Sequence, residues 1–303
     1  MTSAEATQTP GAGRQSNEGA IFLIAPAVVL LVAFLIIPFL LAIGLSLTSQ
    51  RLVSPLPLRF VGLENYARTL SDPAFWQALS NNVSFALVVP TTQTVLGLGL
   101  ALMVNQPLRG ITIFRTIYFL PVVMVLAVVS VLWRLLFAQG GMINAGIGAV
   151  AGGSFEVNWL HDPALAFPAV MIMSIWQNVG FQMILLLAGL QAIPADLYEA
   201  ARVDGANGRQ LFRHITLPGV RNTLIFVMTI SVVTSFLLFD QPYVMTGGGP
   251  AGATQTLMLL MTQVGFVEQR IGQASAIAVI FFVIVLGVAL ISRRFGPRMS
   301  EAN

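Results

Sequence analysis

Six long runs of apolar residues divide the chain, and shorter polar segments separate them. The runs cover residues 21–47, 83–104, 114–137, 165–190, 223–240 and 273–292. A helix of about 20 residues crosses the roughly 30 Å hydrocarbon core of a bilayer. The pattern therefore predicts an all-α membrane protein with six transmembrane helices. Prolines inside several runs are expected to bend these helices around a central space.

The apolar runs and their connections form one transmembrane domain over residues 21–295. The first run is too long for the apolar region of a secretory signal, so we interpret it as a retained anchor. Residues 1–20 are rich in Thr, Gly, Ser and Glu, and we expect them to form a disordered cytoplasmic tail. Residues 296–303 are expected to form a second, shorter cytoplasmic tail.

The arginines predict how the chain crosses the membrane. With both termini in the cytoplasm, ten arginines fall on the cytoplasmic side and five on the outer side. The five outer residues are Arg51, Arg59, Arg68, Arg134 and Arg270. Cytoplasmic segments of membrane proteins carry an excess of Lys and Arg, which favours this orientation over its mirror image.

Composition excludes several kinds of chemistry. Only 9% of the 303 residues are charged and 56% are hydrophobic, whereas soluble proteins carry about 25% charged residues. The chain has no cysteine, so disulfides, iron–sulfur clusters and thiolate zinc sites are excluded. The two histidines, His161 and His214, fall in separate loops. We therefore expect no catalytic residue, no metal site and no cofactor on this chain.

The chain also has no lysine, because all 15 basic residues are arginine. A phosphate-binding loop of the GxxxxGK[ST] type needs its lysine to contact the nucleotide phosphates. If ATP drives this protein, the hydrolysis must take place on another chain. The net charge of +3 comes from scattered arginines, so we do not expect nucleic-acid binding.

The loop between the fourth and fifth runs, residues 191–222, has a definite local pattern. Asp196 and Glu199 have the spacing of a capping box, which predicts a helix from Leu197 to about Asp204. Gly205 can then adopt positive φ and end that helix.

A second short helix is expected after this turn. Asn207 and Gln210 repeat the capping pattern, and Pro218 ends this helix or opens the next span. From the pattern alone, the loop is either a segment that contacts another protein or an amphipathic connector on the membrane surface.

The same residues resemble a known motif. Glu199-Ala200-Ala201, Gly205, and then Ile215, Leu217 and Pro218 resemble the EAA motif of binding-protein-dependent ABC importer permeases. The resemblance extends over residues 21–295. RTIYFLPVVM at 115–124, WQNVGFQM at 176–183 and FDQPYVMTGGGP at 239–250 resemble the carbohydrate and glycerol-phosphate branch, the maltose-permease-like type I importers. Many relatives have a second proline where this chain has Asn222.

This resemblance implies a function in which a partner protein drives the conformational change of this chain. It implies a type I ABC importer permease fold in the bacterial plasma (inner) membrane, whose first loop helix fits a groove on a dimeric ATPase that binds ATP and Mg. Glu199 would pair with a basic group, Ala200 and Ala201 would allow close approach, and Gly205 would permit the turn. The coupling residues it implies are Glu199, Ala200, Ala201, Asp204, Gly205, Phe212, Ile215, Leu217 and Pro218. The other implied partners are a second permease and an extracytoplasmic binding protein.

Polar residues inside the spans are candidates for a substrate path. Ser174, Asn178 and Gln182 recur every four residues and share one helical face. Such residues either face a watery cavity or hydrogen-bond between helices. The residues that we assign to the path are Trp176, Gln177, Asn178, Phe181, Gln182, Ser235 and Asp240.

Arg134 lies within the third apolar run. It either reaches the outer surface with its long side chain or attracts an anionic substrate. The nearby TGGGP at 246–250 has no lysine after it, so it is interpreted as a flexible outer turn rather than a phosphate loop.

Two other classes of function compete with the importer permease, which would take up a sugar or glycerol-phosphate-type solute. A self-sufficient secondary transporter would need inverted repeats and intramembrane carboxylates, and no acidic residue sits centrally in any run. A membrane enzyme would need paired histidines or clustered carboxylates, and the sequence has neither. The sequence leaves the identity of the solute open.

Overall fold

The computed structural model describes residues 17–53, 57–106, 109–153 and 155–295. Within these residues the chain is helical apart from turns, loops and one isolated antiparallel bridge between Thr48 and Phe60. Five helical segments are long and apolar enough to span a membrane: Leu23–Ser46, Pro73–Val104, Ala166–Gln191, Gly208–Phe236 and Ile271–Ser292. A pair of helices bent relative to each other is a sixth if the two together count as one broken span. The described residues confirm the predicted all-α class.

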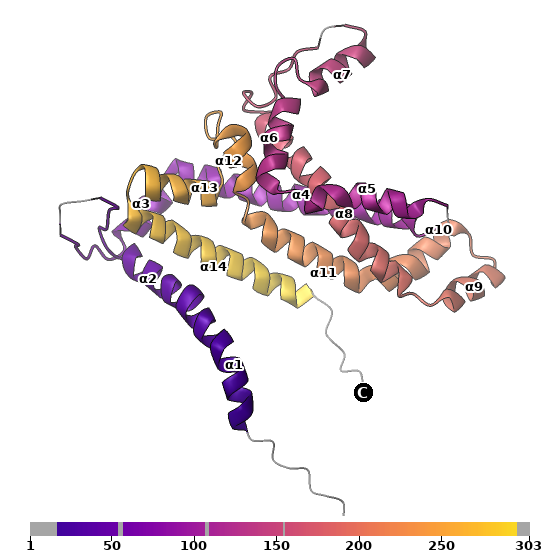
Figure 1. The fold of residues 1–303 in the computed structure, drawn as a ribbon, viewed down its shortest axis with the longest axis horizontal. Coiled ribbons are helices and arrows are strands. Elements are labelled where there is room, and N and C mark those ends of the chain that lie inside the picture. The colour runs from indigo at the N-terminus through magenta and orange to yellow at the C-terminus, as the bar shows by residue number, and fades with distance from the viewer. Residues whose placement is uncertain (1–16, 54–56, 107–108, 154, 296–303) are drawn as a thin grey trace, which may run out of the picture.

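The predicted third span, 114–137, is not one straight helix. α5 (Ile111–Val123) and α6 (Leu126–Leu136) are bent by 100° relative to each other. Met124 and Val125 between them have extended backbone. Pro121 has no N–H to donate to the preceding turn, which weakens the helix where the break follows. α6 therefore packs on α12 (Asp240–Thr246), and α7 (Met142–Ala151) projects away from the other helices (Figure 1).

The first span is continuous, and its second half packs on the bundle while its first half does not. It consists of α1 (Asn17–Leu31), a π-helical turn η1 (Val32–Ile36) and α2 (Ile37–Ser46). α2 packs on α14 (Ile271–Phe295), while α1 diverges from the bundle (Figure 1). Because α1 starts at Asn17, the last four residues of the predicted disordered tail are helical. Residues 1–16 and the predicted tail 296–303 lie outside the described residues.

The centre of the bundle is formed by α4 (Pro73–Val104), α8 (Ala166–Gln191) and α11 (Leu217–Phe236), which pack on one another. A cluster of buried apolar side chains joins these three helices, and it includes Ala101, Met183, Leu186, Val220 and Val227. α5 packs closely on α8, because a Cβ atom added at Gly180 would overlap the carbonyl oxygen of Tyr118. Small residues allow this kind of close helix packing in membranes.

Two groups of shorter elements lie at opposite ends of the longest axis. α9 (Ala195–Val203) is at one end, followed by α10 (Gly208–Leu211) and the π-helical turn η2 (Phe212–Thr216) (Figure 1). α3 (Glu64–Ser71) is at the opposite end. α12 (Asp240–Thr246), α13 (Leu257–Thr262) and the π-helical turn η3 (Gln263–Val267) connect α11 to α14. The second span is longer than predicted, because α4 starts at Pro73.

Candidate functional site

The loop between α8 and α11 folds as a helix, a turn and the start of a second helix, which confirms the first helix and the turn. The predicted second short helix is not separate, because α10, η2 and α11 form one helix from Gly208 to Phe236. No residue of α9 is buried. Glu199 and Ala200 are exposed and Ala201 is half-buried, while Val203 at the end of the helix is 88% exposed. In the described part of the chain Glu199 has no ion-pair partner. α9 therefore presents a carboxylate and apolar side chains on a free surface.

The start of α9 differs from the prediction. Pro194 rather than Asp196 precedes the helix, and no side chain caps its first turn. Proline favours the extended backbone found at this position, so the chain turns into the helix at Ala195. The predicted Asp196–Glu199 capping box is therefore wrong. Asp196 instead lies in the first turn, where its charge is favourable near the helix N-terminus.

The turn after α9 requires a glycine. Gly205 has φ +81°, a left-handed conformation that costs other residues about 1–2 kcal/mol. Its N–H donates to the carbonyl of Arg202 at 3.1 Å, and that of Ala206 donates to the carbonyl of Ala201 at 2.9 Å. These bonds satisfy the last carbonyls of α9 and confirm the predicted turn.

The second capping box is present as predicted. The side chain of Asn207 accepts from the N–H of Gln210 at 3.0 Å, and the N–H of Asn207 donates to the side chain of Gln210 at 2.8 Å. Pro218 is the second residue of α11 and follows the π-helical turn η2, so it neither ends the second helix nor starts the span, which is continuous from Gly208.

Two contacts attach this loop to η2 and to α11. The hydroxyl of Tyr198 on α9 is hydrogen-bonded to that of Thr216 at 3.0 Å, and Ile193 packs against Gly219. A notch of about 290 Å³ lies between α9 and α10. Its lining residues are Ala201, Asp204, Gly205, Ala206, Gln210, Leu211, His214 and Ile215. A displacement of α9 would therefore be transmitted directly to α11.

The predicted coupling residues divide between two surfaces. Ala201, Asp204, Gly205 and Ile215 line the notch. Phe212, Leu217 and Pro218 are exposed on the turn into α11. Glu199 and Ala200 stay on the free face of α9.

A cavity of about 320 Å³ lies among α4, α8, α11 and the segment that leads into α12. Five of the predicted path residues line it: Asn178, Phe181, Gln182, Ser235 and Asp240. The wall also contains polar side chains from α4 and α11, which include Gln93, Ser231 and Thr234, and Gln241 from α12. No arginine lines this cavity, whereas the exposed carboxylate of Asp240 does.

One residue of the polar stripe on α8, Gln182, is also hydrogen-bonded to two other spans. Gln182 is 1% exposed. Its amide nitrogen donates to Gln93 at 3.1 Å and to Ser231 at 2.9 Å, and its oxygen accepts from Thr94 at 2.8 Å. The two interpretations of the stripe, cavity lining and helix–helix hydrogen bonding, therefore both apply to Gln182.

Trp176 and Gln177 do not line the cavity. Each helical residue is rotated by about 100° from the one before it, so Trp176 faces away from Asn178. Its ring lies 5.5 Å from that of Trp133 on α6. Gln177 is buried, with its amide nitrogen 3.5 Å from the carbonyl of Met124 at the α5–α6 break. These two residues therefore lie off the wall of this cavity, and their assignment to the substrate path stays a prediction.

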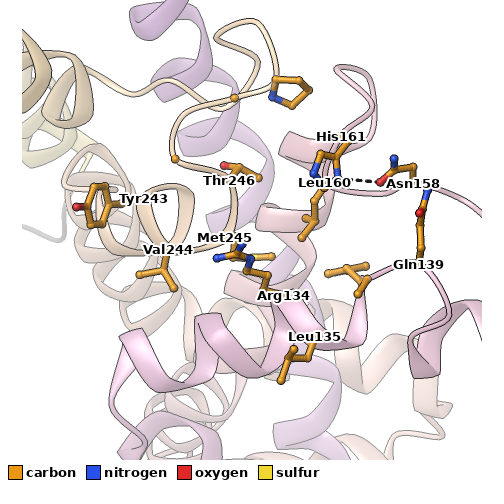
Figure 2. A pocket seen from close by; sticks show the side chains of 15 residues that line it. Arg134, Leu135, Gln139, Asn158, Leu160, His161, Tyr243, Val244, Met245 and Thr246 are labelled. Carbon is orange, nitrogen blue, oxygen red and sulfur yellow. Dashed lines mark hydrogen bonds between the residues drawn. The ribbon is translucent and has the colours of Figure 1, made fainter.

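Arg134 is not deep in a straight span, because it lies in the last turn of α6, beyond the bend. It lines a pocket of about 750 Å³ together with α12, the following turn and residues 158–161 (Figure 2). His161 and Asn158 are hydrogen-bonded at 2.8 Å in the same wall. Arg134 is exposed at this position, which agrees with the first of its two interpretations, and the structure does not test the second.

The glycine-rich turn in this wall is ordered by hydrogen bonds. The hydroxyl of Thr254 is hydrogen-bonded to that of Thr246 at 2.6 Å and donates to the carbonyl of Gly249 at 2.9 Å. The turn was expected to be flexible, but hydrogen bonds of Thr254 hold it in place.

A helical membrane bundle with a polar cavity among its spans and a short exposed helix projecting beyond them defines a membrane transport component. The comparisons with known proteins agree. A family model described as "Binding-protein-dependent transport system inner membrane component" matches residues 93–301. The chain belongs to this family of inner-membrane ABC importer permeases.

Its relatives match over most of their length. The trehalose/maltose transport system permease protein MalF of Thermococcus litoralis is 37% identical over 278 residues, 90% of this chain and 92% of the relative. The lactose transport system permease protein LacF of Rhizobium radiobacter is 36% identical over 272 residues, 89% of this chain and 90% of the relative. The sulfoquinovosyl glycerol transport system permease protein SmoG of Agrobacterium fabrum is 34% identical over 278 residues, 91% of this chain and 89% of the relative.

A solved structure has the same fold. The crystal structure of a bacterial alginate ABC transporter, in complex with its alginate pentasaccharide-bound periplasmic protein, contains a chain that superposes with a TM-score of 0.82. The two chains are 20% identical, and the match covers 94% of this chain and 96% of the other. The predicted type I permease fold is confirmed. Membership of this family makes the chain a transport component rather than an enzyme and gives no support to a secondary transporter.

Proposed function

We propose that this chain is the permease subunit of an ATP-driven importer and that α9 couples it to the ATPase. The observation that carries this proposal is that no residue of α9 is buried while the helix is attached to α11 through Tyr198 and Thr216. A groove on the ATPase would cover α9, and Glu199 would pair with a basic group there. Closure of two ATPase copies on ATP and Mg would then move α9 and α11 together.

The transported solute is proposed to be a neutral saccharide. The cavity offers amide and hydroxyl groups from Asn178, Ser235 and Gln241 beside the aromatic ring of Phe181. The carboxylate of Asp240 accepts strong hydrogen bonds from sugar hydroxyls but repels a phosphate group. Similarity to trehalose/maltose and lactose permeases supports the same solute class over a glycerol phosphate.

A second permease subunit is proposed to complete the path. The first span has no buried residue within its most apolar window, and the lining of the cavity described above includes one carboxylate, that of Asp240. A homologous partner would supply the opposite wall. The arginine distribution supports cytoplasmic termini, with α9 on the cytoplasmic side. The extracytoplasmic binding protein would then dock at the opposite end, and the two open states would alternate.

The test is ATP-dependent uptake by the reconstituted transporter. The chain is co-expressed with its ATPase, partner permease and binding protein, and placed in liposomes. Loss of the partner of a desolvated interfacial charge costs about 2–5 kcal/mol, which is at least about 30-fold in affinity. Glu199→Ala is therefore expected to abolish uptake and release the ATPase, with normal membrane insertion.

Glu156→Ala is the matched control, because Glu156 is an exposed carboxylate far from α9 in the chain. Normal uptake by Glu199→Ala would contradict the coupling role. Uptake by the chain alone, without ATP, would instead indicate a self-sufficient transporter.

A further inference from the structure

Four of the five arginines assigned to the outer side line one pocket. Arg51, Arg59, Arg68 and Arg270 surround a pocket of about 380 Å³, which we call the arginine pocket. The pocket lies where α2 ends, where α3 begins and where α14 begins, at the end of the molecule opposite α9 (Figure 1).

The backbone of the arginine pocket is held in place by hydrogen bonds between distant segments. Asn65, which is 5% exposed, donates to the carbonyls of Ser46 and Thr48, both at 2.8 Å. The N–H of Gly272 donates to the carbonyl of Gln50 at 2.9 Å. A Cβ atom at Gly272 would overlap the carbonyl oxygen of Thr48, so α14 starts directly against this segment. The walls are thus fixed before any ligand binds.

The charges in the arginine pocket are not balanced. Arg68 pairs with Glu64 at 2.8 Å, and Arg270 pairs with Glu268 at 3.4 Å. Arg51 and Arg59 have no carboxylate partner within the described residues. Two positive charges are therefore left to attract an anion, and guanidinium groups bind phosphate in a bidentate way.

The position of the pocket identifies the source of the anion. α2 ends at Ser46 and α14 starts at Ile271, so two spans leave the hydrocarbon region at this point. Directly below the pocket α2 exposes Leu40 and Leu41, which are 58% and 61% exposed. A phosphate group at the pocket would have apolar surface beside it for acyl chains.

We propose that the arginine pocket binds the phosphodiester of an anionic membrane lipid, with its acyl chains along α2. Arg51 and Arg59 would contact the phosphate, and Arg68 and Arg270 would add positive charge around it. An acidic surface on another protein is the competing ligand. The lipid is favoured because the pocket is small, concave and continuous with an exposed apolar helix. This inference does not depend on the proposed saccharide or on ATPase coupling.

The experiment measures lipids that stay bound to the purified full chain, with any subunits that co-purify, by native mass spectrometry. The probes are phosphatidylglycerol, phosphatidylcholine with the same acyl chains, and soluble glycerol 1-phosphate. Each arginine near a lipid surface contributes about fivefold in affinity. Arg51→Gln and Arg59→Gln are each expected to lower the preference for phosphatidylglycerol about fivefold. Arg134→Gln, which removes the same charge outside this pocket, is expected to leave it unchanged.

A gain-of-binding variant separates lipid binding from misfolding. Glu64→Gln frees Arg68 from its ion pair and is expected to raise the preference for phosphatidylglycerol. An equal preference for the two lipids in the unmodified chain, or an equal loss in Arg134→Gln, would overturn the proposal. Displacement of the lipid by glycerol 1-phosphate at equal concentration would indicate a free-phosphate site instead. Loss of binding-protein association with unchanged lipid retention would indicate an acidic protein surface.

Discussion

Gln182 on α8 donates a hydrogen bond of 2.9 Å to the hydroxyl of Ser231 on α11. The same side chain is bonded to Gln93 and Thr94 on α4, so one amide joins the three central spans beside the cavity. Because α11 continues from the loop that carries α9, this junction lies between the cavity and the proposed contact with the ATPase.

Gln182→Leu is expected to destabilise the bundle by about 1–2 kcal/mol, because Thr94, Gln93 and Ser231 lose a buried partner. The thermal unfolding midpoint of the purified chain measures this effect. Gln191→Leu is the control, since Gln191 is exposed at the end of α8. Equal midpoints for the two variants would show that the buried amide contributes nothing to stability.

Gly205→Ala is expected to reduce ATP-dependent uptake about 5- to 30-fold, because alanine disfavours φ +81° by about 1–2 kcal/mol. The stability of the protein should fall by no more than this strain, since α9 contributes no buried residue. Gly208→Ala is the matched control three residues away, where an added Cβ atom meets open space. The prediction fails if both variants transport equally well.

Asp240→Asn distinguishes a neutral from an anionic solute. A hydrogen bond to a charged acceptor contributes about 1.5–3 kcal/mol, so loss of the charge should slow uptake of a neutral saccharide about tenfold or more. The rate is measured with saturating binding protein. Glu156→Gln controls for loss of an exposed carboxylate elsewhere. Faster uptake by Asp240→Asn would point to an anionic solute.

Gly180→Ala is expected to destabilise the protein by about 1–3 kcal/mol, because the added Cβ atom would overlap the Tyr118 carbonyl on α5. Thermal unfolding of the purified chain tests this. Gly146→Ala on α7 is the control, as nothing lies within 4 Å of its added Cβ atom. A Gly180→Ala protein as stable as this control would show that α5 can move away from α8 without cost.

Local signals in the sequence predicted much of the loop between α8 and α11. The left-handed turn at Gly205 and the Asn207–Gln210 capping box depend on residues within a few positions of each other, and both are present. The Asp196 cap failed because Pro194, two residues earlier, sets the extended backbone that starts α9. The capping pattern of Asp196 and Glu199 was considered in the prediction, whereas the effect of Pro194 on the backbone was not.

The path residues were harder to predict because neighbours on a helix face different directions. Asn178 and Gln182 line the cavity, while Trp176 and Gln177, within the same short motif, face α6 and the α5–α6 break. Helical spacing could have separated these two groups, since only residues three or four apart share a face. Gln93 and Gln241 come from other elements, and nothing local indicated that they meet.

The sequence by itself determined that this chain crosses a membrane as helices, carries no nucleotide-binding lysine and has the EAA motif in one loop. These properties depend on apolar run length, on residue identity and on short spacings, which do not require a folded structure. Only the tertiary structure decided that the third span bends by 100°, that Gln182 joins three spans, and that four arginines surround one pocket. The physical reason is that the Gln182 contacts and the arginine pocket join residues up to about two hundred positions apart, which only helix packing brings together. The size of the bend depends on how α5 and α6 pack on their neighbours, although Pro121 marks its place.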